Sequence, residues 1–286
     1  MTDAIRIQDL CKQYDHFALK NVSFNLPQGS IMGFIGENGA GKTTTLKALL
    51  GLIRCESGKV QFFGKDFVGH ETEIKEEIGV VFDESNFHEN LQAKEVSSIL
   101  SHIYKNWDDA LFFQYLRTFQ LPERKKIKEF SRGMKTKLSI AAALAHHPRL
   151  LILDEATSGL DPVVREEILD IFLDFIQEED HSVLISSHIT SDLDKIADYI
   201  TFIHQGQIVF SKPRDELLDD LGILKCSPQT LSAIDPQYII RVRRGSYGTE
   251  ALIKDKHHFR ATHPGLIVDN TNTEEIMLFY NRGEEK

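Results

Sequence analysis

The sequence predicts an α/β fold, and three stretches carry this prediction. Residues 31–35 read as a buried strand that passes through a glycine-rich turn into a segment with apolar residues at helical spacing. Residues 150–153 are four apolar residues in a row, which is typical of a parallel strand buried on both faces. Residues 182–188 form a third strand, which ends in polar residues. Because ligands of open α/β sheets bind at the carboxyl ends of the strands, we expect the functional groups there.

The composition is that of a globular protein and argues against some function classes. The 286 residues carry a net charge of −10, which disfavours a surface that binds duplex nucleic acid. The three cysteines stand far apart without a C-x-x-C pair, so reduced thiols in a cytoplasm are the expected state. No apolar run approaches the roughly 18 residues of a membrane helix, and we find no signal-peptide pattern. We therefore expect no segment that crosses a bilayer.

The N-terminal region alternates apolar and polar residues as strands do, at residues 4–9 and 21–26. Tyr14 lies in a turn between these two strands. An aromatic residue just before a phosphate-binding unit can stack on a nucleotide base, although a tyrosine in a turn more often serves packing. Spacing alone leaves both interpretations open.

The glycine-rich turn at residues 36–43 fits the pattern G-x-x-x-x-G-K-[ST]. Its glycines allow backbone N–H groups to surround phosphate oxygens, and the helix that follows adds its positive N-terminal end. Lys42 is expected on the β- and γ-phosphates, and the Thr43 hydroxyl on Mg²⁺. A glycine turn without a ligand is the alternative, which the complete spacing disfavours. The predicted nucleoside-triphosphate loop comprises Gly36, Glu37, Asn38, Gly39, Ala40, Gly41, Lys42, Thr43 and Thr44.

The middle of the chain changes from strands to helices. Residues 60–63 and 78–82 read as strands, and the second one ends at Asp83. From about residue 91 to 146 the apolar residues follow helical spacing, so we assign residues 84–146 to an inserted helical subdomain. Within it, Ser131 is the expected N-cap of an alanine-rich helix that Pro148 stops.

Two carboxylates follow the apolar run at residues 150–153. Asp154 lies at the carboxyl end of this strand, where a carboxylate can hold Mg²⁺ through water. Glu155 is then placed to polarise an attacking water. The alternative is a helix N-cap with a surface glutamate beside it, and the intact phosphate loop disfavours this alternative.

The strand at residues 182–188 ends at His188, which is either a sensor of the γ-phosphate or a cap or core residue. Residues 200–203 and 207–210 form an expected hairpin through Gln205 and Gly206. Beyond Pro213 the pattern weakens, with strand candidates at 239–242 and 266–268 and a capping-box pattern before an apolar helix at 276–280.

Together these stretches resemble the nucleotide-binding subunit of an ABC transporter over residues 4–215. The resemblance equates residues 36–43 with Walker A, 150–154 with Walker B, Glu155 with the catalytic glutamate and His188 with the switch histidine. It also equates Asp161 with the D-loop and Tyr14 with the adenine-stacking aromatic. The implied fold is a P-loop NTPase of the ABC type, with a mixed sheet core, a helical subdomain and an antiparallel β subdomain. Residues 1–215 would be the ATPase domain, and 216–286 a small α+β extension.

Two positions depart from the common family pattern. The signature Leu-Ser-Gly-Gly-Gln is replaced by Phe-Ser-Arg-Gly-Met at residues 130–134, which keeps Ser131 and Gly133 but introduces Arg132 and Met134. The glutamine of the Q-loop is replaced by Asp83, which can still hold Mg²⁺ or a water. Such departures look like those of bacterial ABC-2-type exporters. The ending at residues 274–280 is similar to a subgroup of drug, lantibiotic and phenol-soluble-modulin exporters.

The resemblance implies a mechanism and a set of partners. Two ATPase subunits, identical or related, would face each other head to tail, so that each ATP with Mg²⁺ lies between Walker A of one and Ser131 and Gly133 of the other. A separate membrane-spanning subunit would contact the helical subdomain near residues 83–90, at the cytoplasmic face of the membrane. Nucleic acid is not an expected partner.

Two rival functions remain at this stage. A soluble single-cassette ABC ATPase in cofactor assembly would share every motif and would lack only the membrane partner. A P-loop phosphotransferase, such as a small-molecule kinase, would need an acceptor pocket and no nucleotide-driven dimer. The ordered set that includes Ser131, Asp161 and His188 argues against the phosphotransferase.

Overall fold

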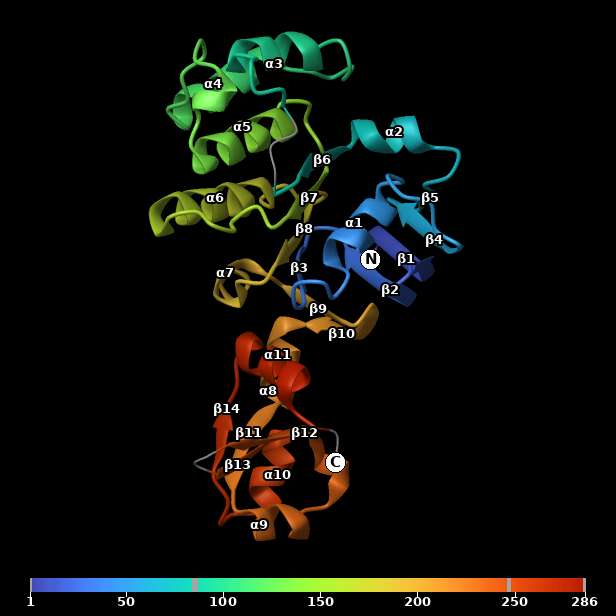
Figure 1. Ribbon diagram of the computed structural model, residues 1–286, viewed down its shortest axis with the longest axis vertical. Coiled ribbons are helices and arrows are strands. Elements are labelled where there is room, and N and C mark those ends of the chain that lie inside the picture. The colour runs from blue at the N-terminus through green and yellow to red at the C-terminus, as the bar shows by residue number, and fades with distance from the viewer. Residues whose placement is uncertain (1, 84–86, 246–247, 285–286) are drawn as a thin grey trace.

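The computed structural model describes residues 2–83, 87–245 and 248–284 (Figure 1). Its N-terminal part is an antiparallel sheet with the strand order β2-β1-β4-β5. The strands are β1 (Asp3–Gln13), β2 (Ala18–Pro27), β4 (Ser57–Phe62) and β5 (Lys65–Asp66). Alternation in β1 places Ile5 and Ile7 in a buried cluster with Phe34 and Leu46. The sheet therefore packs against the phosphate-loop strand and its helix.

The central sheet is mixed and has the strand order β10-β9-β3-β8-β7-β6. Its strands are β3 (Ile31–Ile35), β6 (Ile78–Val81), β7 (Leu150–Asp154), β8 (Ser182–Ser187), β9 (Tyr199–His204) and β10 (Gln207–Pro213). All neighbours pair in parallel except β9 and β10, which form the expected hairpin. Every residue of β3, β7 and β8 is buried, because helices cover one face of the central sheet and the N-terminal sheet with α1 covers the other. The parallel strands thus deliver their carboxyl ends to one edge.

Helices α1 (Lys42–Leu49), α2 (Glu71–Glu76), α6 (Pro162–Phe175) and α7 (Thr190–Ile196) flank the sheets. A helical block lies at one end of the molecule, shown at the top of Figure 1. It comprises α3 (Ala93–Leu100), α4 (Asp109–Thr118), the 3₁₀ turn Ile127–Glu129 and α5 (Arg132–Leu144). Phe112, Leu116 and Leu138 form part of the core that joins this block to the sheet. Residues 84–86, which belong to the predicted helical subdomain, lie outside the described residues.

The chain after β10 builds a further antiparallel sheet at the opposite end (Figure 1). Its elements are α8 (Arg214–Asp220), β11 (Gly222–Cys226), α9 (Pro228–Ala233), the 3₁₀ turn Pro236–Tyr238, β12 (Ile239–Gly245), β13 (Gly248–Ile253), α10 (Lys256–Thr262), β14 (Val268–Asn270) and α11 (Thr273–Arg282). The sheet has its own small core around Leu224, Ile253 and Phe259. Helix α11 turns back and buries Ile276 and Phe279 in the core of the central sheet.

These elements confirm the predicted fold class, a mixed α/β sheet with a helical block and an antiparallel sheet. The strand expected at 239–242 lies within β12, whereas the one expected at 266–268 begins at Val268. The sequence did not predict β11 and β13. Their local residue patterns do not indicate strands, and it is their pairing with each other that defines them.

Candidate active site

The phosphate loop connects β3 to α1, whose first backbone N–H groups have no partner within the helix. Gly41 is the N-cap of α1, with φ 117, and has no side chain to cap these groups. At Gly36 a Cβ atom would come within 2.5 Å of the Ile203 carbonyl oxygen on β9, so the loop needs glycine there. Ala40 is buried in the neighbouring core. Contacts with β9 and with the core therefore hold the loop in place, and the first N–H groups of α1 can bind an anion.

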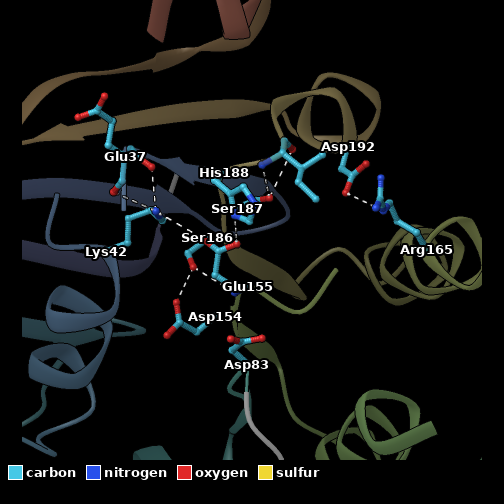
Figure 2. Close-up of polar contacts among 12 residues, drawn as sticks. Glu37, Lys42, Asp83, Asp154, Glu155, Arg165, Ser186, Ser187, His188 and Asp192 are labelled. Carbon is cyan, nitrogen blue, oxygen red and sulfur yellow. Dashed lines mark hydrogen bonds and ion pairs between the residues drawn. The ribbon is translucent and has the colours of Figure 1, made fainter. Parts of the chain in front are cut away.

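Lys42 places its ammonium group inside this loop (Figure 2). Its Nζ donates hydrogen bonds to the carbonyl oxygens of Gly36 at 2.8 Å and Glu37 at 3.3 Å, and lies 3.4 Å from Glu155 Oε1. The side chain is only 6% exposed. A buried cation with one carboxylate beside it is a strong point of attraction for a phosphate.

Two carboxylates stand at the end of β7, and Ser186 on the neighbouring strand β8 contacts both residues. Ser186 Oγ donates to Asp154 Oδ1 at 2.6 Å, and the Ser186 carbonyl accepts the Glu155 N–H at 3.1 Å. Glu155 has a positive φ of 54, an uncommon conformation for a residue with a side chain. Its carboxylate lies between Lys42 and His188, whose Nδ1 is 2.6 Å from Glu155 Oε2. Glu155, His188 and Lys42 are thus in one polar network.

This network borders a cavity of about 580 Å³. The lining residues are His16, Phe17, Glu37, Asn38, Gly39, Gly41, Lys42, Thr43, Thr44, Asp83, Glu155, Ser158 and His188. Asp154 lies buried behind Ser186 at the end of β7. The predicted phosphate and carboxylate residues therefore converge on one place, from four separate segments of the chain.

The aromatic ring at this cavity belongs to Phe17, not to Tyr14. A Cβ atom on Gly41 would lie 2.8 Å from Phe17 Cζ, so the ring packs directly on the phosphate loop. The Tyr14 ring is partly exposed and has Lys12 Nζ 5.2 Å from its centre. Its stacking on adenine stays a prediction. The sequence pattern did not indicate Phe17, because only its tertiary contact with Gly41 brings the ring to the loop. His16, which lines the same cavity, gave no signal either.

The signature segment lies apart from the phosphate loop. Ser131 is the N-cap of α5 and its Oγ accepts the Met134 N–H at 3.3 Å. Ser131, Gly133 and Met134 line a second cavity of about 370 Å³ together with Asp161. Asp161 caps α6 by accepting the N–H groups of Val163 and Val164. Among the described residues, none of the phosphate loop borders this cavity.

Asp83 and Arg132, two of the residues that depart from the family pattern, form an ion pair. Arg132 Nη2 donates to Asp83 Oδ1 in an ion pair whose side chains are about half exposed. Asp83 also borders the phosphate-loop cavity. Sequence reasoning treated the two residues separately, because 49 positions divide them. Ser186 was also missed, since a serine within an apolar strand gives no signal of its own.

A phosphate loop after the first parallel strand, with carboxylates after β7 and a histidine after β8, defines a P-loop nucleotide-hydrolysing protein. Comparison with known proteins identifies the family within this class. The model of the ABC transporter family matches residues 19–158. The bacitracin transport ATP-binding protein BcrA of Bacillus licheniformis is 38% identical over 223 residues, which cover 76% of this chain and 72% of that protein.

Other relatives agree with this match. The lantibiotic transport ATP-binding protein SrtF of Streptococcus pyogenes is 36% identical over 222 residues, covering 76% of this chain and 95% of that protein. A solved ATP-binding subunit of an ABC transporter aligns with a TM-score of 0.68 and 25% identity, over 75% of this chain and 91% of that one. The chain belongs to the ABC transporter family, as one of its ATP-binding ATPase subunits. None of the helices in the described ranges combines the length and hydropathy of a bilayer-spanning segment.

Proposed function

We propose that this chain powers export of a substrate through a separate membrane-spanning subunit, at the cytoplasmic face of the membrane. ATP would close a dimer of two ATPase subunits, and hydrolysis would open it. The observation that supports the dimer is that the phosphate loop and the signature residues border different cavities of one chain, so that one chain does not bring them together. The names of the relatives make bacitracin-like and lantibiotic peptides the first substrates to test.

Glu155 is our candidate general base, because its carboxylate reaches the cavity and His188 can hold it in place. When phosphates reach Lys42, they compete with Glu155 for the ammonium and leave that carboxylate free to accept a proton from water. His188 would then orient the γ-phosphate. Lys42 and the loop N–H groups would neutralise the charge that develops in the transition state.

Thr43 and Asp154 are our candidate ligands of Mg²⁺, with Asp83 as a third. Magnesium binds proteins through one or two carboxylates and takes its other ligands from phosphates and water. Asp154 fits this role, because Ser186 occupies one of its oxygens and positions the other. Bound Mg²⁺ would neutralise part of the charge on the phosphates.

The second half of each site would come from the partner subunit in the dimer. Ser131 and Gly133, flanked by Arg132 and Met134, would contact the γ-phosphate across the interface, and Asp161 would lie beside them. We assign residues 1–215 to the ATPase domain and residues 216–286 to an extension.

The membrane partner would dock beside the helical block. A cavity of about 430 Å³ there is lined by Phe82, Phe87 and Phe130, with Glu89 and Lys135 among its charged residues. Aromatic side chains beside charged ones suit one amphipathic helix of a partner. Part of the predicted docking segment, residues 84–86, lies outside the described residues.

The variant Glu155→Gln tests the dimer mechanism. Without its base the protein should lose at least about 10²-fold in ATP hydrolysis and should remain a closed dimer with ATP and Mg²⁺, as measured by light scattering after size exclusion. Glu166→Gln, a change on α6 outside the cavity, is the matched control and should behave as the wild type. A Glu155→Gln protein that hydrolyses ATP normally and stays monomeric would refute the assignment.

Cell fractionation distinguishes a transporter subunit from a soluble single-cassette ABC ATPase. A transporter subunit should be recovered with the membrane together with a hydrophobic partner, whereas a cofactor-assembly ATPase should remain in the soluble fraction. Recovery in the soluble fraction alone would favour that alternative.

A further inference from the structure

The ion pair between Asp83 and Arg132 stands at a junction of three functional segments. Asp83 follows β6 and borders both the phosphate-loop cavity and the cavity beside the helical block. Arg132 is the first residue of α5, between Ser131 and Gly133, and borders the helical-block cavity and the signature cavity. The pair therefore joins the end of a core strand to the signature segment.

Arg132 also touches the loop that precedes α6. A Cβ atom on Gly159 would lie 2.5 Å from Arg132 Nη1 and 2.9 Å from Cζ, so the guanidinium packs against this glycine. Gly159 has a φ of 67, which a side chain would also strain. One arginine thus contacts the end of β6 and the loop that carries Asp161.

The charges explain what the pair does for nucleotide binding. An unpaired Asp83 carboxylate in the cavity would repel the triphosphate, whose charge is of the same sign. Arg132 offsets that carboxylate. Both side chains are half exposed, with 50% and 47% of their surface accessible, and ion pairs of this kind are weak and exchange readily. The pair can therefore open when Asp83 gains another partner.

We propose that Arg132 is a positioning residue that holds Asp83 until nucleotide and metal load. Arg132 screens the carboxylate from the incoming triphosphate. Asp83 would then be available to hold Mg²⁺, and Arg132 to act at the surface that carries Ser131 and Gly133. Asp83 and Arg132, two of the departures from the family pattern, would then be one device. This inference rests on the proposed function, because it requires ATP at the phosphate loop.

A double-mutant cycle on the full chain tests the inference. ATP affinity is measured by calorimetry, with EDTA present to remove metal and stop hydrolysis, for Arg132→Gln, Asp83→Asn and the double variant. Arg132→Gln should weaken ATP binding by about threefold or more, because it leaves the Asp83 charge unscreened. In the Asp83→Asn background the same change should have no effect. Arg132→Lys should restore most of the affinity.

Lys195→Gln breaks a similarly exposed ion pair with Glu166 on α6, away from the cavities that Arg132 borders, and should leave ATP affinity unchanged. An equal loss from Arg132→Gln in both backgrounds would overturn the inference and leave the proposed function intact. A wild-type chain that binds no ATP would overturn both.

Discussion

At the scale of single residues, Ser186 shows how the fold positions its carboxylates from a neighbouring strand. It pairs in register with Asp154, its hydroxyl donates to the Asp154 carboxylate, and its carbonyl accepts the Glu155 N–H. The side chain is fully buried. The Ser186 hydroxyl thus orients the Asp154 carboxylate, and the Ser186 carbonyl holds the backbone of Glu155.

Replacing Ser186 by alanine should raise the Mg²⁺ concentration needed for half-maximal ATPase activity, because Asp154 loses the donor that orients it. Loss of a hydrogen bond to a buried carboxylate should also lower the free energy of unfolding by about 1–3 kcal/mol. Titration of ATPase activity with Mg²⁺ and urea unfolding measure the two effects.

Ser182→Ala is the matched control for this prediction. Ser182 is buried at the other end of β8, where its hydroxyl accepts the Gly29 N–H at 3.2 Å. It should lose stability without a change in the Mg²⁺ requirement. Equal Mg²⁺ curves for Ser186→Ala and the wild type would contradict the orienting role.

At the scale of elements, α5 connects the signature segment to a buried histidine. His146 follows the helix and is 1% exposed; its ring stacks on Tyr104 at 4.0 Å, and its Nε2 lies 3.1 Å from the Ile78 carbonyl oxygen on β6. Its Nδ1 has no hydrogen-bond partner among the described residues. Burial lowers the pKa of His146 below its ordinary value, although the hydrogen bond to Ile78 opposes the shift.

This lowered pKa makes stability depend on pH in a defined direction. Above the ordinary histidine pKa of about 6.5, His146 is neutral in the folded and unfolded states and adds no pH dependence. Below it the unfolded chain binds the proton first, so the free energy of unfolding falls as the pH drops toward the folded-state pKa. His146→Phe keeps a ring against Tyr104 and should flatten this fall, as measured by urea unfolding between pH 8 and pH 5. Parallel profiles for the two proteins would refute the assignment.

The elements that sequence reasoning predicted well are those with local signals. The phosphate loop and β7 follow from glycine spacing and an apolar run, both readable within ten residues. Contacts over long distances were not predictable in this way. The packing of Phe17 on Gly41, the pair of Asp83 with Arg132 and the pairing of β11 with β13 all depend on which segments the fold brings together.

At the scale of the whole molecule, α11 ties the C-terminal sheet to the catalytic core. Thr273 donates a hydrogen bond to Asp194 on α7, the helix that follows His188. Phe279 is fully buried in the same core as Ile31, and the Tyr280 ring lies 5.4 Å from Phe202 on β9. The helical block and the C-terminal part, which lie at opposite ends of the molecule in Figure 1, therefore share one apolar core.

Phe279→Ala should consequently destabilise the distant helical block. Removing this ring should lower the free energy of unfolding by about 3–5 kcal/mol. Because a shared core unfolds cooperatively, the helical block should be destabilised as well. Trp107, the only tryptophan of the chain, lies between α3 and α4 and reports on the block by its fluorescence. The urea midpoint seen by Trp107 should fall in this variant.

Ile267→Ala is the control, because Ile267 is 70% exposed in the C-terminal part. It should leave the Trp107 transition in place. If Phe279→Ala also leaves it in place, while circular dichroism shows a separate early transition, the C-terminal sheet unfolds independently.

Because α11 packs against the central core, this core cannot be completed until the C-terminal helix has been synthesised. A nascent chain that has emerged only as far as β10 still lacks Ile276 and Phe279, so the apolar surfaces that they cover are open to water and to other chains. Ribosome-bound intermediates of this length should be good clients for chaperones, and slow translation past residue 213 should favour their aggregation.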